Sequence, residues 1–374
     1  MWLKAIWQRS GQQPGRMRNR GIVLAKIKVY GLEQAEEWKK ILTRFPKADI
    51  YYSPEYTKGF AENGDGEPLL LHYTGDRLQA VNVVMKRPVP LPENLNPADE
   101  ELRGYVDYVT PYGYGGFLLE GEQSETELQQ LQKVYADFCR DHKVVAEFVR
   151  FHPVLNNAHT VENLYEVIDL GNTICMDLTS PEIIWQNLSS KNRNMIRKAQ
   201  KSGVQVYWGR EPALFEEFED IYRETMDKVG AQDYYYFKKE FYDNILYDMK
   251  QQAMIFYARL EGQTIAASII LYDGNALQYH LSASRKAYQS YAPTNLILYE
   301  AACWGSALGA KTFHLGGGLG SSHDDLYHFK KQFNRNADCT FSIGRVKMNE
   351  AVYDRLWELN NHKKETGYFP AYRA

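Results

Sequence analysis

Long apolar runs, patterned cysteines and a strong net charge are all missing from this chain of 374 residues. No apolar stretch reaches the roughly 18 residues that a membrane-spanning helix requires. The four cysteines are widely separated and form no C-x-x-C pair, so we expect reduced thiols, no disulfide framework and no metal site. A net charge of -3 excludes a general attraction to nucleic acid or anionic membranes, so such a partner would need a local basic patch.

What the sequence does contain is enough apolar residues for two compact cores. Hydrophobic residues make up 44% of the chain and charged residues 24%, which is a globular composition. The length suits two domains. We expect a basic leader at 1–27, a first domain at 28–160, a second domain at 161–340, and a final strand and helix at 341–374 that pack back on the first domain.

The predicted basic leader lacks the continuous apolar core of a secretory signal. We therefore expect a cytoplasmic protein with a loose N-terminal extension. Peripheral contact of this extension with the inner membrane surface stays an open alternative, and the sequence predicts no particular oligomeric state.

The two halves repeat one order of elements with little shared sequence. Each half begins with a helix and continues with a hairpin, a third strand, an amphipathic helix and a buried strand. In the first half these elements are expected at 54–60, 68–86, 105–119, 125–142 and 144–151. In the second half they are expected at 213–229, 253–272, 277–282, 295–308 and 311–315. Because hairpin, strand, helix, strand is the order of the acetyltransferase (GNAT) fold, we predict an α/β protein of two tandem GNAT-like domains whose sheets face each other across a cleft.

A cationic helix is predicted at 181–201. Ser180 suits its N-cap and Pro181 its first turn. Lys191, Arg193 and Arg197 follow with no acidic residue beside them. Since like charges one turn apart repel in isolation, such a run suits the phosphates of a ligand. A solvated basic surface is the alternative.

Three glycines, Gly316 to Gly318, directly follow the last predicted strand. Without side chains, their backbone amides could approach a ligand closely. The segment is not a Walker loop, because the Lys-Ser/Thr end is missing. It is not a dinucleotide fingerprint either, because no long helix opens at the last glycine. A plain turn explains the glycines equally well.

Two lysines, Lys330 and Lys331, lie between Phe329 and Phe333. The two phenylalanines are one helical turn apart, so we expect them to be buried together and to fix the directions of the lysines. A lysine held beside the glycine turn would stabilise the oxyanion of an acyl-transfer intermediate, a contribution on the order of 3 kcal/mol. A pair of exposed surface lysines is the alternative. No G-x-S-x-G elbow is present, which favours direct attack over a serine nucleophile.

Taken together, these segments resemble the Fem family of aminoacyltransferases, which build peptidoglycan cross-bridges. The likeness extends from about residue 28 onward. In the second half it rests on 191–199 (KNRNMIRKA) followed by Gly203-Val204, on 295–296 (NL), on 314–317 (HLGG) and on 329–333 (FKKQF). In the first half, 51–56 (YYSPEY) and 112–116 (YGYGG) are similar to family positions.

The resemblance implies that an acyl group moves from a carrier to an amine, and that Lys330 stabilises the tetrahedral intermediate. The family's cleft carboxylate follows an Arg-Gly-Pro motif. Here Gly115-Gly116-Phe117 stands in that place, which implies Glu120 as the carboxylate, with Asp107 as a nearby competitor. The expected substrate-binding residues are Lys191, Arg193, Arg197, Tyr114, Gly316, Gly317, Gly318, Asn295 and Lys331.

The same resemblance implies charged tRNA as the donor, a cell-wall or lipid-linked glycan precursor as the acceptor, and no bound cofactor. Acyl-CoA enzymes of this fold carry a glycine-containing pyrophosphate loop, and the corresponding segment 286–295 has no glycine. This favours aminoacyl-tRNA over acyl-CoA. Where many members carry Arg-Asp-Gly-Phe, this chain has Ala231-Gln232-Asp233-Tyr234, which disfavours a nucleotide-linked muropeptide acceptor.

Two alternatives to aminoacyl transfer stay open. The first is acyl-CoA-dependent N-acetylation of an amino sugar. The second is a non-catalytic tandem protein that binds a glycan or RNA without turnover.

Overall fold

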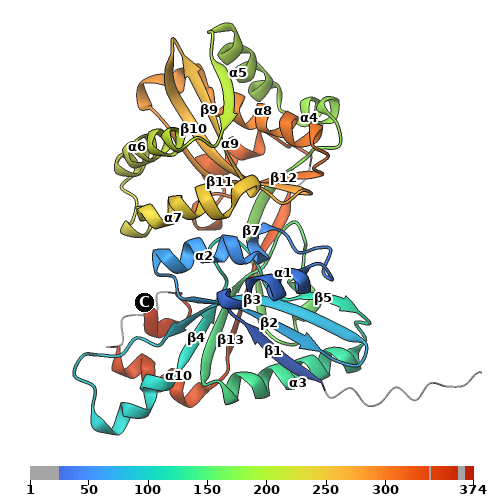
Figure 1. Ribbon diagram of the computed structural model, residues 1–374, viewed down its shortest axis with the longest axis vertical. Coiled ribbons are helices and arrows are strands. Elements are labelled where there is room, and N and C mark those ends of the chain that lie inside the picture. Colours follow the sequence, from blue (N-terminus) through green and yellow to red (C-terminus); the bar gives the residue numbers. More distant parts are fainter. Residues whose placement is uncertain (1–24, 337, 361–366) are drawn as a thin grey trace, which may run out of the picture.

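Figure 1 shows the computed structural model, which describes residues 25–336, 338–360 and 367–374. Apart from residues 25–27, the predicted leader lies outside the described residues. The strands are β1 (Lys26–Tyr30), β2 (Glu67–Thr74), β3 (Leu78–Pro88), β4 (Val106–Val109), β5 (Leu118–Gly121), β6 (Val144–Arg150), β7 (Glu166–Asp177), β8 (Gln205–Gly209), β9 (Ala253–Leu260), β10 (Gln263–Tyr272), β11 (Ala276–Ser284), β12 (Thr312–Gly316) and β13 (Cys339–Lys347). The helices are α1 (Ala35–Leu42), α2 (Pro54–Asn63), α3 (Glu125–Asp141), α4 (Pro181–Asn187), α5 (Ser190–Lys201), α6 (Pro212–Val229), α7 (Lys239–Asp243), α8 (Pro293–Ala307), α9 (Asp325–Lys331) and α10 (Glu350–Leu359). In this part of the chain no helix is long and apolar enough to cross a membrane.

The first half and the late strand β13 build one sheet, in the lower part of Figure 1. Its strands follow the order β1-β2-β3-β4-β6-β13, and β5 pairs with β3 off this path. β4 and β6 are parallel and α3 connects them. Because Leu131, Tyr135 and Phe138 recur at helical spacing, α3 buries one face on the core of this sheet.

The second half repeats the plan in the upper part of Figure 1. Its strands follow the order β7-β12-β11-β10-β9-β8. β9, β10 and β11 are antiparallel neighbours, whereas β11 and β12 are parallel and joined through α8. α8 is buried on several sides, as its residues Leu296, Ile297 and Leu298 show.

The two sheets are continuous with each other, which the sequence did not predict. β7 runs through both of them: its first part pairs with β13 (Cys339↔Thr173) and its last part with β12 (Thr312↔Asp177). β13 in turn pairs with β6 of the first half. The long strand β7 therefore fixes one sheet relative to the other.

Two predicted elements are broken in the structure. The helix predicted at 181–201 is interrupted after Asn187, because Ser189 is extended and its Oγ accepts the N–H of Asn192 at 3.1 Å to start α5. The strand predicted at 105–119 is split into β4 and β5. Gly113 and Gly116 lie between them at φ of 95° and 89°, a left-handed conformation that ends strand pairing.

An aromatic core joins the two halves. It combines Phe60 of α2 with Phe218 of α6 and Phe241 of α7 in one buried cluster. The Phe60 and Phe241 rings lie 5.2 Å apart between centroids. Since aromatic side chains bury large apolar areas, this contact holds the two halves together.

Candidate active site between the two sheets

A cavity lies where β11 and β12 separate. Their parallel pairing covers only Ala276–Gln278 against 312–314. Next to this point β11 carries a bulge at His280, because Ile269 is opposite Leu281 and Ile270 is opposite Tyr279. The strands therefore diverge around a cavity of about 270 Å³. It is lined by Tyr51, Tyr112, Gly113, Tyr114, Arg150, Tyr235, Tyr279, His280, His314, Leu315, Gly316, Gly317, Gly318, Leu319, Gly320, Leu326 and Lys330.

Lys330 is held in this cavity by local structure. Asp324 caps α9 by accepting the N–H of Tyr327 at 2.8 Å. Phe329 precedes the lysine in sequence and Phe333 follows it, and the centroids of their two rings lie 5.5 Å apart. Lys330 is only 8% exposed, and its Nζ donates to the carbonyl oxygen of Gly317 at 2.7 Å. The structure thus brings Lys330 and the glycine turn together.

The glycine turn leaves no room for side chains. Gly316 adopts a φ of 75°, and a Cβ there would lie 3.3 Å from the Lys330 Nζ. A Cβ on Gly317 would meet the carbonyl oxygen of Asn172 at 2.7 Å. Glycine is therefore required for the close contact between this turn, β7 and the lysine.

Burial lowers the pKa of Lys330 to about 8, although the negative charge of Asp324 opposes the shift. At neutral pH the amine is still mostly protonated. An ammonium has three N–H donors, and Gly317 accepts one of them. No other hydrogen bond of this Nζ is found among the described residues, so two donors remain for an oxygen atom that enters the cavity.

We expect catalytic turnover to fall as the pH rises above about 8, because Lys330 then loses its charge. The measurement is kcat at saturating substrate across the pH range. Lys330→Arg serves as the control, since a guanidinium stays protonated throughout; any activity it keeps should not show this fall. A wild-type kcat that climbs steadily through and beyond the pKa of Lys330 would contradict the assignment.

Two histidines in the cavity wall, the half-buried His280 and the buried His314, are uncharged at neutral pH. His280 packs among the rings of Tyr56, Phe60 and Phe241, and burial lowers its pKa to about 3. His314 contacts the Oγ1 of Thr173 at 2.8 Å through Nε2, and burial holds its pKa well below the usual value. The sequence did not single out either residue, since nothing in it reveals the bulge that turns His280 inward.

The predicted carboxylates are not brought to Lys330. Glu120 lies on β5 opposite Gln79 and is not among the residues lining the cavity. Asp107 is fully buried on β4, where it accepts from the Nε of Arg87 at 2.8 Å, from the hydroxyl of Tyr372 at 3.0 Å and from Arg373. These contacts make Asp107 an anchor for the C-terminal segment.

The arginines predicted to bind substrate instead make contacts with the protein itself. Arg193 donates to the carbonyl oxygen of Leu188 at 2.6 Å and so satisfies the end of α4. The Arg197 guanidinium lies 5.1 Å from the ring centroid of Trp185. On the same helix, Lys191 is exposed.

Two further predicted binding residues lie outside the cavity lining. Asn295 donates to the Oδ1 of Asn192 at 2.8 Å and thereby ties α8 to α5. Lys331 forms an ion pair with Asp338. Of the predicted site residues, the cavity brings together Lys330, Tyr114 and the three glycines.

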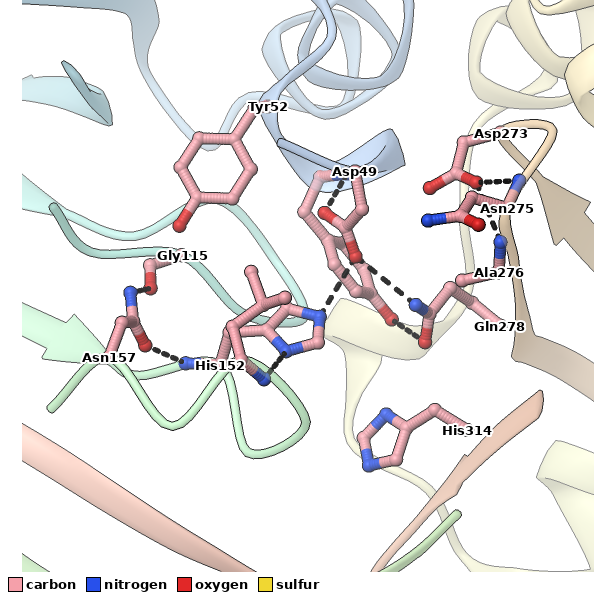
Figure 2. Close-up of polar contacts among 12 residues, drawn as sticks. Asp49, Tyr52, Gly115, His152, Asn157, Asp273, Asn275, Ala276, Gln278 and His314 are labelled. Atoms are coloured by element: carbon pink, nitrogen blue, oxygen red, sulfur yellow. Dashed lines mark hydrogen bonds and ion pairs between the residues drawn. The ribbon is translucent and has the colours of Figure 1, made fainter. Parts of the chain in front are cut away.

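A buried polar network holds the wall of the cavity (Figure 2). Asp49 Oδ2 accepts from Nε2 of His152 at 2.8 Å and from Nε2 of Gln278 at 3.1 Å. His152 Nδ1 accepts the backbone N–H of Leu155, so the ring proton lies on Nε2. Gln278 in turn accepts from the hydroxyl of Tyr51 at 3.4 Å. The network thus links the first half to β11 beside the cavity.

Comparison with known proteins agrees with this geometry. Residues 187–331 match the acetyltransferase (GNAT) domain model. No curated protein matches the sequence significantly. Among solved structures, FemX superposes with a TM-score of 0.62 at 14% identity, over 86% of this chain and 98% of FemX.

Two further structures share the fold. A conserved protein of unknown function from Bacteroides thetaiotaomicron has a TM-score of 0.56 at 12% identity, over 87% of this chain and all (100%) of that one. The C-terminal domain of a proposed lysylphosphatidylglycerol synthetase from Agrobacterium fabrum has a TM-score of 0.52 at 12% identity, over 86% and 92% of the two chains.

The fold class predicted from the sequence is therefore confirmed: the chain is an α/β protein with tandem GNAT-like domains, the fold of GNAT acyltransferases. Within that class, its arrangement is similar to FemX, so the predicted resemblance to the Fem family is confirmed at the level of the fold.

Proposed function

We propose that the protein transfers an acyl group from an activated carrier to an amine, in the cavity where β11 and β12 separate. The observation that carries this proposal is the buried Lys330, whose Nζ bonds Gly317 and keeps further donors free. A preorganised cation in a water-poor site stabilises the oxyanion of acyl transfer far better than the same cation does in water.

The charges of the cavity favour an acceptor that enters as a free amine. Arg150 and Lys330 line it, both histidines are neutral, and no carboxylate occurs among the described lining residues. Nearby positive charge disfavours an ammonium.

The neutral nitrogen attacks the acyl carbonyl, the C–N bond forms, and Lys330 stabilises the oxyanion. The bond to the carrier then breaks, and the nitrogen loses one proton while the carrier gains one.

For the donor and acceptor, we propose aminoacyl-tRNA and an amine of a cell-wall or surface-glycan precursor, which places the reaction in the cytoplasm. The likeness to FemX supports this assignment. So does α5, which carries the exposed lysines Lys191, Lys198 and Lys201. The stretch before α8, where acyl-CoA enzymes bind a pyrophosphate, is a glycine-free helical turn at Lys286–Tyr291.

A second candidate is acyl-CoA-dependent N-acylation of an amino sugar. It is favoured by the match of residues 187–331 to the acetyltransferase domain. For this candidate, Lys330 stabilises the oxyanion in the same way, and only the carrier of the acyl group differs.

The test offers both donors in parallel to the purified protein. One reaction receives total tRNA charged with radiolabelled amino acids, and the other radiolabelled acetyl-CoA. Each also contains glucosamine and glucosamine-bearing lipid-linked precursors as acceptors. Label that moves from tRNA to an acceptor supports the first candidate, and label that moves from acetyl-CoA supports the second. No transfer with either donor would favour a non-catalytic binding protein.

A further inference from the structure

A second cavity of about 300 Å³ adjoins the first one. The two cavities share Tyr114, Arg150, Gly317, Gly318 and Gly320. The glycine turn that receives Lys330 in the first cavity is therefore also a wall of the second. A molecule in the second cavity would lie next to the proposed site of acyl transfer.

The floor of the second cavity is one face of three neighbouring strands. Residues two apart on a strand share a face, and β6, β13 and β7 lie side by side. The apolar residues of this floor are Phe148, Phe341, Ile343 and Leu170. Leu170 is 46% exposed, so the apolar surface is open to solvent.

Arg150 is the charged residue of this cavity, and it stands at the junction with the first one. Its Cζ lies 5.6 Å from the ring centroid of Tyr112, which orients the guanidinium. No ion pair of Arg150 is found among the described residues, and no described lining residue of either cavity is acidic. A half-buried arginine without a counter-charge, at the end of an apolar floor, suits an external anion.

Resting on the proposed function, we propose that the second cavity binds the acceptor, whose anionic group pairs with Arg150 and whose adjoining apolar portion lies on Phe148, Leu170, Phe341 and Ile343. The amine of the acceptor then reaches Lys330 past the glycine turn. The anion is a carboxylate or a phosphate, both of which a guanidinium binds through paired hydrogen bonds.

Binding of small probes tests this proposal without any turnover. Phenyl phosphate and phenylacetate carry the two anions on an apolar ring, and phenylacetamide is the uncharged control. Affinities are measured by NMR titration of the full chain. We expect both anions to bind more tightly than phenylacetamide, and Arg150→Ala to weaken their binding at least tenfold. Arg150→Lys should keep part of it, and phenylacetamide should be unaffected by either change.

A second pair of variants tests the apolar floor. Leu170→Glu adds a negative charge at an exposed site and should also weaken anion binding at least tenfold. Leu308→Glu is its matched control, because Leu308 is 51% exposed and lies beyond the end of α8, outside both cavity linings. If Arg150→Ala fails to fold, the Leu170 pair still decides the question.

The outcomes separate this proposal from the acyl-transfer proposal. If Arg150→Ala loses binding of only one of the two anionic probes, the result supports the site and identifies which anion it binds. Anion binding that is unchanged in Arg150→Ala, or that Lys330→Ala abolishes instead, overturns the site. In Lys330→Ala, anion binding should persist although acyl transfer fails.

Discussion

Replacing Lys330 by alanine is expected to lower kcat by roughly two to three orders of magnitude, with a much smaller change in KM. Loss of one oxyanion donor typically costs that much, because the interaction forms fully only in the transition state. Steady-state kinetics, with whichever donor the parallel assay shows to be used, provide the measurement. Lys331→Ala is the control: it lies on the same helix, pairs with Asp338 and is not among the cavity-lining residues, so its kcat should stay near that of wild type.

The loss of activity in a Lys330 variant should not come from unfolding. The pKa of Lys330 falls from 10.5 in an exposed chain to about 8 in the fold, so below pH 8 its burial opposes folding, and this penalty disappears as the pH rises toward 10.5. The shift corresponds to at most roughly 3 to 4 kcal/mol. Lys330→Met should therefore have a Tm at neutral pH equal to or above that of wild type. A markedly lower Tm would contradict the argument that burial of the lysine opposes folding, whereas a wild-type kcat in Lys330→Ala would contradict the catalytic role.

The parts of this fold that the sequence predicts well are governed by local rules. The order of hairpin, strand, helix and strand follows from periodicity and turn residues within each half. The place of Lys330 follows from the short helix α9, which carries Phe329 and ends at Lys331, from the packing of Phe329 against Phe333, and from the glycine turn nearby in sequence. Such contacts depend on few residues, which are separated by short distances along the chain.

The parts that the sequence does not predict depend on contacts between distant strands. β7 joins the two sheets through partners more than 100 residues away, such as Cys339 for Thr173. Arg150 lines the same cavity as the glycine turn only because β6, β13 and β7 are neighbours. The bulge at His280 arises from the register between β10 and β11, and no residue type in that strand signals it.

Asp107 illustrates the same limit: the family resemblance implied it as a competitor for the catalytic carboxylate, whereas the fold surrounds it with structural partners. Its partners Tyr372 and Arg373 lie at the far C-terminus. Arg87 on β3 contributes the other ion pair, and the side chains of Arg87 and Arg373 are only 21% and 18% exposed. The aspartate therefore joins β4 and β3 to the end of the chain.

Asp107→Ala is accordingly expected to destabilise the protein by about 3 kcal/mol or more, since it leaves two largely buried guanidinium groups without their counter-charge. Thermal and urea unfolding measure this loss. Glu166→Ala removes a comparable but exposed pair with Arg345, and should cost less than about 1 kcal/mol. At a temperature where Asp107→Ala remains folded, its kcat should match wild type, because Asp107 does not line the cavity. A general base would instead lose about two to four orders of magnitude in rate while the Tm stayed unchanged, so the two measurements together decide between an anchor and a catalyst.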